Sequence, residues 1–227
     1  METVTLPAAF PAAWRCIYLA QFDHVRNGGQ LRDALIAASR TPPGSADRAR
    51  MDYAFVDARL ILSTRQLLTA CIQAMAAAQR RRSVVDETQV GFKTPSVHSE
   101  ILWTLNPNNN IADALRRFGV SAATETLILV RVAGAPPHGV APQVLVDEMA
   151  ALVDGVLCTD GLRLPLDGTG PEDSIAHLSL REDSTTNSTA RTQDAAKAYK
   201  LRDTPVARYP RELEEVICSV VATKYVG

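Results

Sequence analysis

The segment ETLILVRVAG, residues 125–134, is rich in Val, Ile and Leu. Such a run predicts a strand at the centre of a β-sheet. It closely follows NPNNNIADALRRFGV, residues 106–120, in which three successive asparagines precede an amphipathic segment that stops at a glycine. This order predicts a turn, a short helix and then a core strand.

The segments on either side of this stretch predict a mixture of strands and helices. Further strands are predicted at CIYLAQF (16–22) and VHSEILWTL (97–105), and a short strand leading to a turn is predicted at YAFVDARLI (53–61). Helices are predicted after the NGG turn up to residue 39, at 63–82, at 144–153 and from Pro210 onward. Together they predict one α+β domain over 1–227, in which a mostly antiparallel sheet of about four strands packs against several helices.

Three polar segments interrupt this pattern. Residues 41–52, 83–95 and 159–193 are rich in Gly, Pro, Ser, Thr, Asp and Asn or in charged side chains. Such composition buries little apolar surface, so these segments are expected to be mobile loops.

The three asparagines have a local structural explanation. Asn110 is placed to be the N-cap of the helix, and Asp113 suits the positive end of its dipole. Asn108 and Asn109 follow a proline and suit a turn. Gly119 is expected to end the helix in a left-handed conformation.

Charge and targeting signals limit the classes of protein. The net charge is −1, with 24 Lys and Arg against 25 Asp and Glu, which argues against a general nucleic-acid coat but not against a small basic patch. The chain shows no signal-peptide pattern and no run of about 18 apolar residues. Its four cysteines form no CxxC pair and are expected to be reduced thiols. We expect a protein of the nucleus and cytoplasm that does not enter membranes.

Catalytic motifs are missing from the sequence. The four histidines form no HxxxH pair and lie at no metal-ligand spacing from a cysteine. No P-loop, GxGxxG or GxSxG is present, and DGTGPED at 167–173 follows no convincing strand. We therefore expect neither an enzyme, nor a metal site, nor a cofactor.

Several segments, in this order and spacing, resemble a known family. NPNNNIADALRRFGV with ILVRV, together with the segments named below, is similar to the PRPK-binding protein family, the small kinase-binding subunits of the KEOPS (EKC) complex. The other matching segments are FDHVRNGGQLRDAL, YAFVDARLILSTRQLLTACIQA, SEILWTL (as a strand), AYKL (198–201) and ICSVVATKYV. The resemblance covers most of the chain outside the three polar loops.

The resemblance implies a non-catalytic role. Relatives bind the small atypical kinase subunit of the complex, and that kinase contacts the ATPase subunit. The ATPase subunit places threonylcarbamoyl on the adenosine next to the anticodon of tRNA. Relatives are also implicated in holding the single-stranded 3′ CCA end of the tRNA, and in fungi the complex is linked to telomere maintenance, which adds telomeric single-stranded DNA as a ligand. The alternative is a protein-only scaffold that binds and regulates the kinase without touching nucleic acid.

The resemblance also places the kinase-binding surface near the end of the asparagine-led helix. We predict Phe118 as an exposed aromatic anchor; the alternative is that Phe118 closes the core. The residues assigned to kinase binding are Ile111, Leu115, Arg117, Phe118, Gly119 and Val120.

Nucleic-acid binding is assigned to the positively charged residues that lie close in the sequence to a segment resembling the family. Cations bind phosphates, and polar or planar groups contact unstacked bases. The predicted residues are Arg80, Arg81, Arg82, Lys93 and His98. The alternative is that the arginines only complement a helix dipole. Relatives often carry a basic residue where Pro95 stands, and this difference favours the protein-only scaffold.

Overall fold

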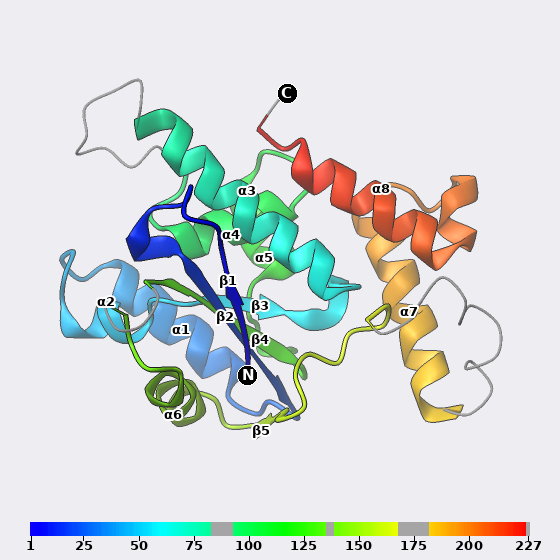
Figure 1. Ribbon diagram of the computed structural model, residues 1–227. Coiled ribbons are helices and arrows are strands. Elements are labelled where there is room, and N and C mark those ends of the chain that lie inside the picture. The colour runs from blue at the N-terminus through cyan, green and yellow to red at the C-terminus, as the bar shows by residue number, and fades with distance from the viewer. Residues whose placement is uncertain (83–92, 135–138, 168–181, 226–227) are drawn as a thin grey trace.

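A computed structural model describes residues 1–82, 93–134, 139–167 and 182–225 (Figure 1). Its centre is an antiparallel sheet in the order β1-β2-β4-β3, and β5 also pairs with β2. The strands are β1 (Glu2–Thr5), β2 (Cys16–Asp23), β3 (Ala54–Asp57), β4 (Leu127–Ala133) and β5 (Val156–Leu157). β4 lies between β2 and β3, which confirms that the ILVRV segment is a central strand.

Helices cover both faces of the sheet (Figure 1). In chain order they are α1 (Gly28–Ser39), α2 (Ala46–Arg50), α3 (Thr64–Arg82), α4 (Val97–Leu105), α5 (Ile111–Phe118), α6 (Pro142–Leu152), α7 (Glu182–Ala198) and α8 (Pro210–Ala222), with short 3-10 turns at Ala12–Trp14, Ala58–Leu60 and Pro205–Arg208. Because strand side chains alternate between faces, Ile17 and Leu19 of β2 pack toward α3, α4 and α8, whereas Ala20 and Phe22 pack toward α1 and α6.

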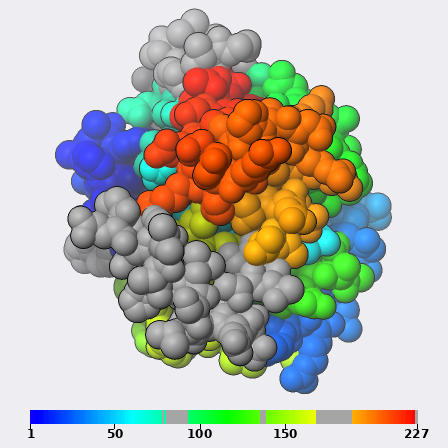
Figure 2. Space-filling model, turned by 90° about the vertical axis from the view of Figure 1, so that its right-hand side faces the viewer, coloured from blue at the N-terminus to red at the C-terminus, as the bar shows by residue number. Residues whose placement is uncertain are grey.

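The C-terminal part of the chain lies against the larger helical layer. α8 packs on α3, and the turn before α8 contacts α7. Figure 2 shows the residues of α8 lying above those of α7 on one side of the molecule. Pro210 begins α8 as predicted, and Pro142 begins α6, two residues before the predicted start at 144, because proline fits the first helical position.

The segment 97–105 is a helix, so its prediction as a strand is wrong. Ser96 caps α4 by accepting from the backbone N–H of Ser99, and Ser99 reaches back to the N–H of Ser96. All residues of α4 except Ser99 are buried. A helix that is buried on nearly every side shows no polar face, and its periodicity therefore cannot be told from that of a buried strand. β1 and β5 were not predicted.

Two of the predicted loops contain helices. Ser45 caps α2 within 41–52, and α7 occupies the end of 159–193. Residues 83–92 and 168–181, in which most of the remaining loop predictions fall, lie outside the described residues. No helix in the described ranges has the length and apolar character that crossing a bilayer requires.

Candidate functional site

The asparagine turn before α5 is held by its own side chains. The Asn110 side-chain oxygen accepts from the N–H of Asp113 at 3.1 Å, and the Asn108 oxygen accepts from the N–H of Asn110 at 3.0 Å. Asn108 also donates to the Asp113 carboxylate at 2.7 Å. These contacts confirm that Asn110 caps the helix and that Asn108 forms the turn.

Lys224, just after α8, fastens the same turn from a distant part of the chain. Its ammonium group donates to the backbone carbonyl of Asn106 at 2.6 Å and to that of Asn108. Buried Asn106 in turn donates through its amide to the Asn108 side chain at 2.6 Å and to the Asn110 carbonyl at 3.2 Å. The turn is therefore fixed both locally and by the C-terminal segment.

The end of α5 differs from the prediction at Gly119. Its φ and ψ are −82° and 160°, so the residue is extended and the left-handed prediction is wrong. The backbone bridges to Val56 beside the sheet. A Cβ atom on Gly119 would lie 2.4 Å from the Leu115 carbonyl oxygen. Glycine is thus required by close approach and not by a positive φ.

Phe118 is a core residue, and the prediction that it is exposed is wrong. Its exposed fraction is 0%. The ring packs edge-on against Tyr199, with 6.2 Å between ring centroids, and the Tyr199 hydroxyl donates to the Leu105 carbonyl at 2.5 Å. Val120 is buried on the other face of the sheet. The alternative, in which Phe118 closes the core, describes the structure.

Two other predicted residues form the exposed face of α5. Ile111 and Leu115 are 37% and 46% exposed, and they lie one helical turn apart, where side chains are neighbours. Arg117 turns inward instead: it pairs with Asp113 at 2.8 Å and donates to the Ala198 carbonyl at 3.1 Å. The exposed face therefore contains an apolar pair, and polar contacts hold the helix in place.

The carboxylate of Asp113 is the centre of these contacts. Partial burial acts to raise its pKa, but hydrogen bonds from Arg117, Asn108 and Arg116 hold the pKa well below its usual range. Asp113 therefore stays charged at any pH at which the protein is expected to work, and the start of α5 stays fixed.

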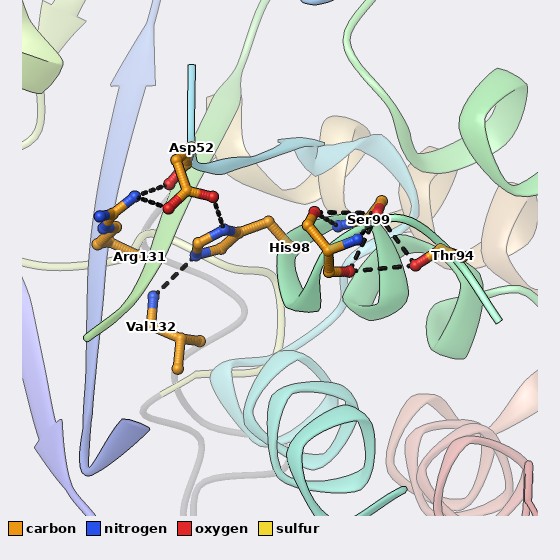
Figure 3. Close-up of polar contacts among 7 residues, drawn as sticks. Asp52, Thr94, His98, Ser99, Arg131 and Val132 are labelled. Atoms are coloured by element: carbon orange, nitrogen blue, oxygen red, sulfur yellow. Dashed lines mark hydrogen bonds and ion pairs between the residues drawn. The ribbon is translucent and has the colours of Figure 1, made fainter. Parts of the chain in front are cut away.

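His98 lies inside the protein and not on a nucleic-acid surface. Its Nδ1 lies 2.8 Å from the Asp52 carboxylate, and its Nε2 accepts from the backbone N–H of Val132 at 3.0 Å (Figure 3). Asp52 is also paired with Arg131. Since β3 pairs with β4 only as far as Val130, His98 satisfies a β4 donor that has no partner in β3. Its exposed fraction is 3%, so the placement of this side chain on an exposed surface is wrong.

The histidine network makes stability depend on pH. Burial lowers the pKa of His98 despite the opposing effect of Asp52. In the unfolded chain the histidine binds a proton near pH 6.5, whereas the folded protein resists protonation. The free energy of unfolding should therefore fall, by up to about 1.4 kcal/mol per pH unit, as the pH drops below about 6.5.

Denaturant unfolding at several pH values measures this dependence. His98→Gln, which removes the titrating group but can still donate to Asp52, should flatten the curve. His24→Asn provides the control, because His24 is exposed and asparagine tolerates its φ of 54°. An unchanged pH dependence in His98→Gln would contradict the assignment.

The predicted basic residues are only partly described. Arg80, Arg81 and Arg82 end α3, but their side chains lie outside the described part. Lys93 is exposed, and its ammonium group lies 4.6 Å from the centroid of the Trp103 ring. Lys224, to which no role was assigned from the sequence, lies 4.4 Å from the same centroid. Only the ICSVVATKYV resemblance singled out its segment.

The buried carboxylate of Glu100 connects the segments that carry Lys93 and Lys224. Glu100 accepts from the backbone N–H of Thr94 at 2.9 Å, from its hydroxyl at 2.7 Å and from the Tyr225 hydroxyl at 2.9 Å. The Tyr225 ring packs on Trp103 with 5.3 Å between centroids. The lysine-bearing segments before α4 and after α8 are therefore attached to the same helix.

Metal-ligating and thiol side chains among the described residues bear on metal binding and on nucleophilic chemistry. The described residues contain no cluster of three or more His, Cys, Asp or Glu side chains that could hold a metal. All four thiols are unpaired. Burial raises the pKa of Cys71 to about 12, and burial with a hydrogen bond to Asp23 raises that of Cys158 to about 11. These two thiols stay protonated and are poor nucleophiles.

Comparison with known proteins defines the class. A family model described as kinase binding protein CGI-121 matches residues 22–165, more than half of the chain. This matched region contains the end of β2, the strands β3 to β5, the helices α1 to α6 and the asparagine turn. The class is thus that of small α+β proteins whose family is described as kinase binding. The chain belongs to the CGI-121 family.

Individual relatives agree with this assignment. The EKC/KEOPS complex subunit CGI121 of Gibberella zeae is 37% identical over 142 residues, which cover 63% of this chain and 62% of the relative. The subunit of the same name from Cryptococcus neoformans is 32% identical over 157 residues (58% and 68%), and that from Yarrowia lipolytica is 35% identical over 125 residues (55% and 63%). The chain thus spans 62% to 68% of the length of these relatives.

Proposed function

We propose that this protein is the non-catalytic, kinase-binding subunit of a KEOPS/EKC complex. Membership of the CGI-121 family and the names of the relatives support the proposal. The observation that carries it in the structure is the exposed pair Ile111 and Leu115 on α5. The partner is the small atypical kinase subunit, through which the protein is connected to the ATPase subunit.

The α5 surface suits a binding partner because it is apolar and already ordered. Binding surfaces gain affinity when their residues do not have to be immobilised on association. Asn110 caps the start of α5, Lys224 holds the turn before it, and Arg117 attaches the helix to the Ala198 carbonyl. Exposed Arg116, ion-paired with Asp113, adds a polar rim beside the apolar pair, the arrangement found around interface hot spots.

The finer part of the proposal is that the protein helps to dock tRNA. It holds the single-stranded 3′ CCA end while the complex forms threonylcarbamoyladenosine next to the anticodon. Exposed Lys93 and the arginines that end α3 supply the cations for phosphate contacts. Telomeric single-stranded DNA presents the same phosphate chemistry and is a second ligand, in keeping with a location in the nucleus and the cytoplasm.

A second candidate function is a protein-only scaffold of the kinase. The net charge of −1 favours it, since nucleic-acid affinity depends mainly on phosphate contacts. The burial of His98 also favours it, because one predicted base contact is removed. In this case the α5 surface still binds the kinase, and Lys93 and the arginines that end α3 have no role in binding.

Titration with tRNA decides between the two functions. The purified full chain should bind intact tRNA more tightly than tRNA that lacks the 3′ CCA, at one fixed salt concentration. The triple variant Arg81→Glu, Arg82→Glu, Lys93→Glu should bind at least about tenfold more weakly. Three side chains that would attract phosphates become negatively charged and repel them.

The matched control reverses three charges elsewhere. Arg32, Arg40 and Lys197 are exposed, and their replacement by glutamate changes the net charge equally. Equal losses in the two triple variants would show that only the overall charge matters. Absence of binding to either RNA would leave the kinase scaffold as the function.

A further inference from the structure

Two lysines that are far apart in the sequence lie beside one aromatic ring. Lys93 precedes α4, Lys224 follows α8, and their ammonium groups lie 4.6 Å and 4.4 Å from the Trp103 ring centroid. Trp103 is 2% exposed, so the ring is a fixed support. Cations at this distance are attracted to the ring face, which explains how two like charges are held together.

The two ammonium groups have no ion-pair partner among the described residues. The carboxylate in the cluster, Glu100, accepts its hydrogen bonds from Thr94, from Tyr225 and from the backbone of Lys93. Burial and the nearby charge of Lys93 lower the pKa of Lys224 to about 8. An anion bound between the lysines would relieve this repulsion.

Lys224 has a hydrogen-bond donor left for such an anion. An ammonium group carries three N–H donors, and two of them are used by the carbonyls of Asn106 and Asn108. Lys93 is exposed, and its ammonium group makes no hydrogen bond to the other described residues beyond its ring contact. Each of the two ammonium groups therefore keeps at least one N–H donor for an oxyanion.

We propose that Lys93 and Lys224 together bind one phosphate group beside Trp103. Lysine binds phosphate as a point charge, and two such charges suit a group with at least one full negative charge. Resting on the RNA-docking role proposed above, the phosphate belongs to a single-stranded RNA end; free inorganic phosphate shares the same chemistry. Lys224 is thereby a phosphate-binding residue as well as the support of the asparagine turn.

Nuclear magnetic resonance of the full chain titrated with inorganic phosphate tests the site. The indole N–H of Trp103 should shift and reach saturation, while that of Trp14, on another part of the chain, serves as an internal reference. Lys93→Met and Lys224→Met should each weaken binding about tenfold, the loss expected for one charge-assisted contact. Lys197→Met, an exposed control with the same charge change, should have no effect.

The two lysine variants also separate phosphate binding from the attachment of the asparagine turn. Only Lys224 contacts the asparagine turn, so Lys224→Met should shift the backbone resonances of residues 106–110 without any phosphate, whereas Lys93→Met should not. Loss of phosphate binding in Lys224→Met alone would mean that the turn has been disturbed, and the shared site would be rejected. An unmoved Trp103 signal in the parent protein would also reject it.

A single-stranded RNA ending in CCA distinguishes this inference from the proposed function. Each methionine variant should reduce the slope of log affinity against log salt by about 0.7, the value for one phosphate contact on a single strand. RNA binding with unchanged slopes would overturn the lysine site and leave RNA docking in place. Phosphate binding at Trp103 without RNA binding would keep the site and overturn RNA docking.

Discussion

Replacing Phe118 with alanine should lower the free energy of unfolding by about 3 to 5 kcal/mol, the usual cost of removing a buried aromatic side chain. Phe118 is fully buried in the larger core cluster and packs edge-on against Tyr199. Because α4, β3 and the 3-10 turn at Ala58–Leu60 pack against α5, little movement can fill the cavity that alanine leaves.

Equilibrium unfolding in denaturant measures this loss. Leu115→Ala on the same helix is the matched control: Leu115 is 46% exposed, so its truncation should change stability by no more than about 0.5 kcal/mol. If Phe118→Ala kept its stability but lost the kinase, the ring would be an interface anchor after all.

Leu115→Glu should weaken binding of the small kinase subunit by about 100-fold or more, as expected for an interface hot spot. A carboxylate at this position would be desolvated against an apolar partner surface without a paired cation. Ile111→Glu should act in the same direction, because Ile111 lies one turn away on the same face. Isothermal calorimetry with the purified kinase subunit measures the change.

Ile36→Glu gives a control of equal exposure. Ile36 is 45% exposed on α1, and α1 covers the opposite face of the sheet from α5. This variant should bind the kinase like the parent protein, and circular dichroism should show that all three variants are folded. Undiminished kinase binding by Leu115→Glu would show that the kinase does not bind at α5.

Local chemistry explains which parts of the fold could be predicted from the sequence. The run around Leu129 predicted the central strand, Asn110 predicted a helix start, and Pro210 predicted the start of α8. Each depends on residues within a few positions of one another, where caps and periodicity act. The family resemblance drew on several such segments and is confirmed by the family match.

The same local reasoning failed where burial or conformation depended on distant segments. The segment 97–105 lacks a polar face because the sheet and neighbouring helices surround it, so its period was hidden. Phe118 was predicted to be exposed because nothing in its neighbourhood shows that Tyr199 covers it. His98 was assigned to a surface because its partners Asp52 and Val132 lie far away in the sequence.

The sequence by itself therefore determined the fold class, the central strand, the asparagine cap and the family. The tertiary structure alone decided which face of α5 is free, and it alone brought Lys93 and Lys224 to the same Trp103 ring. The physical reason is the range of the interactions. Caps and periodicity act within a turn or two of the chain, whereas burial and charge pairing depend on which distant segments the folded core brings together.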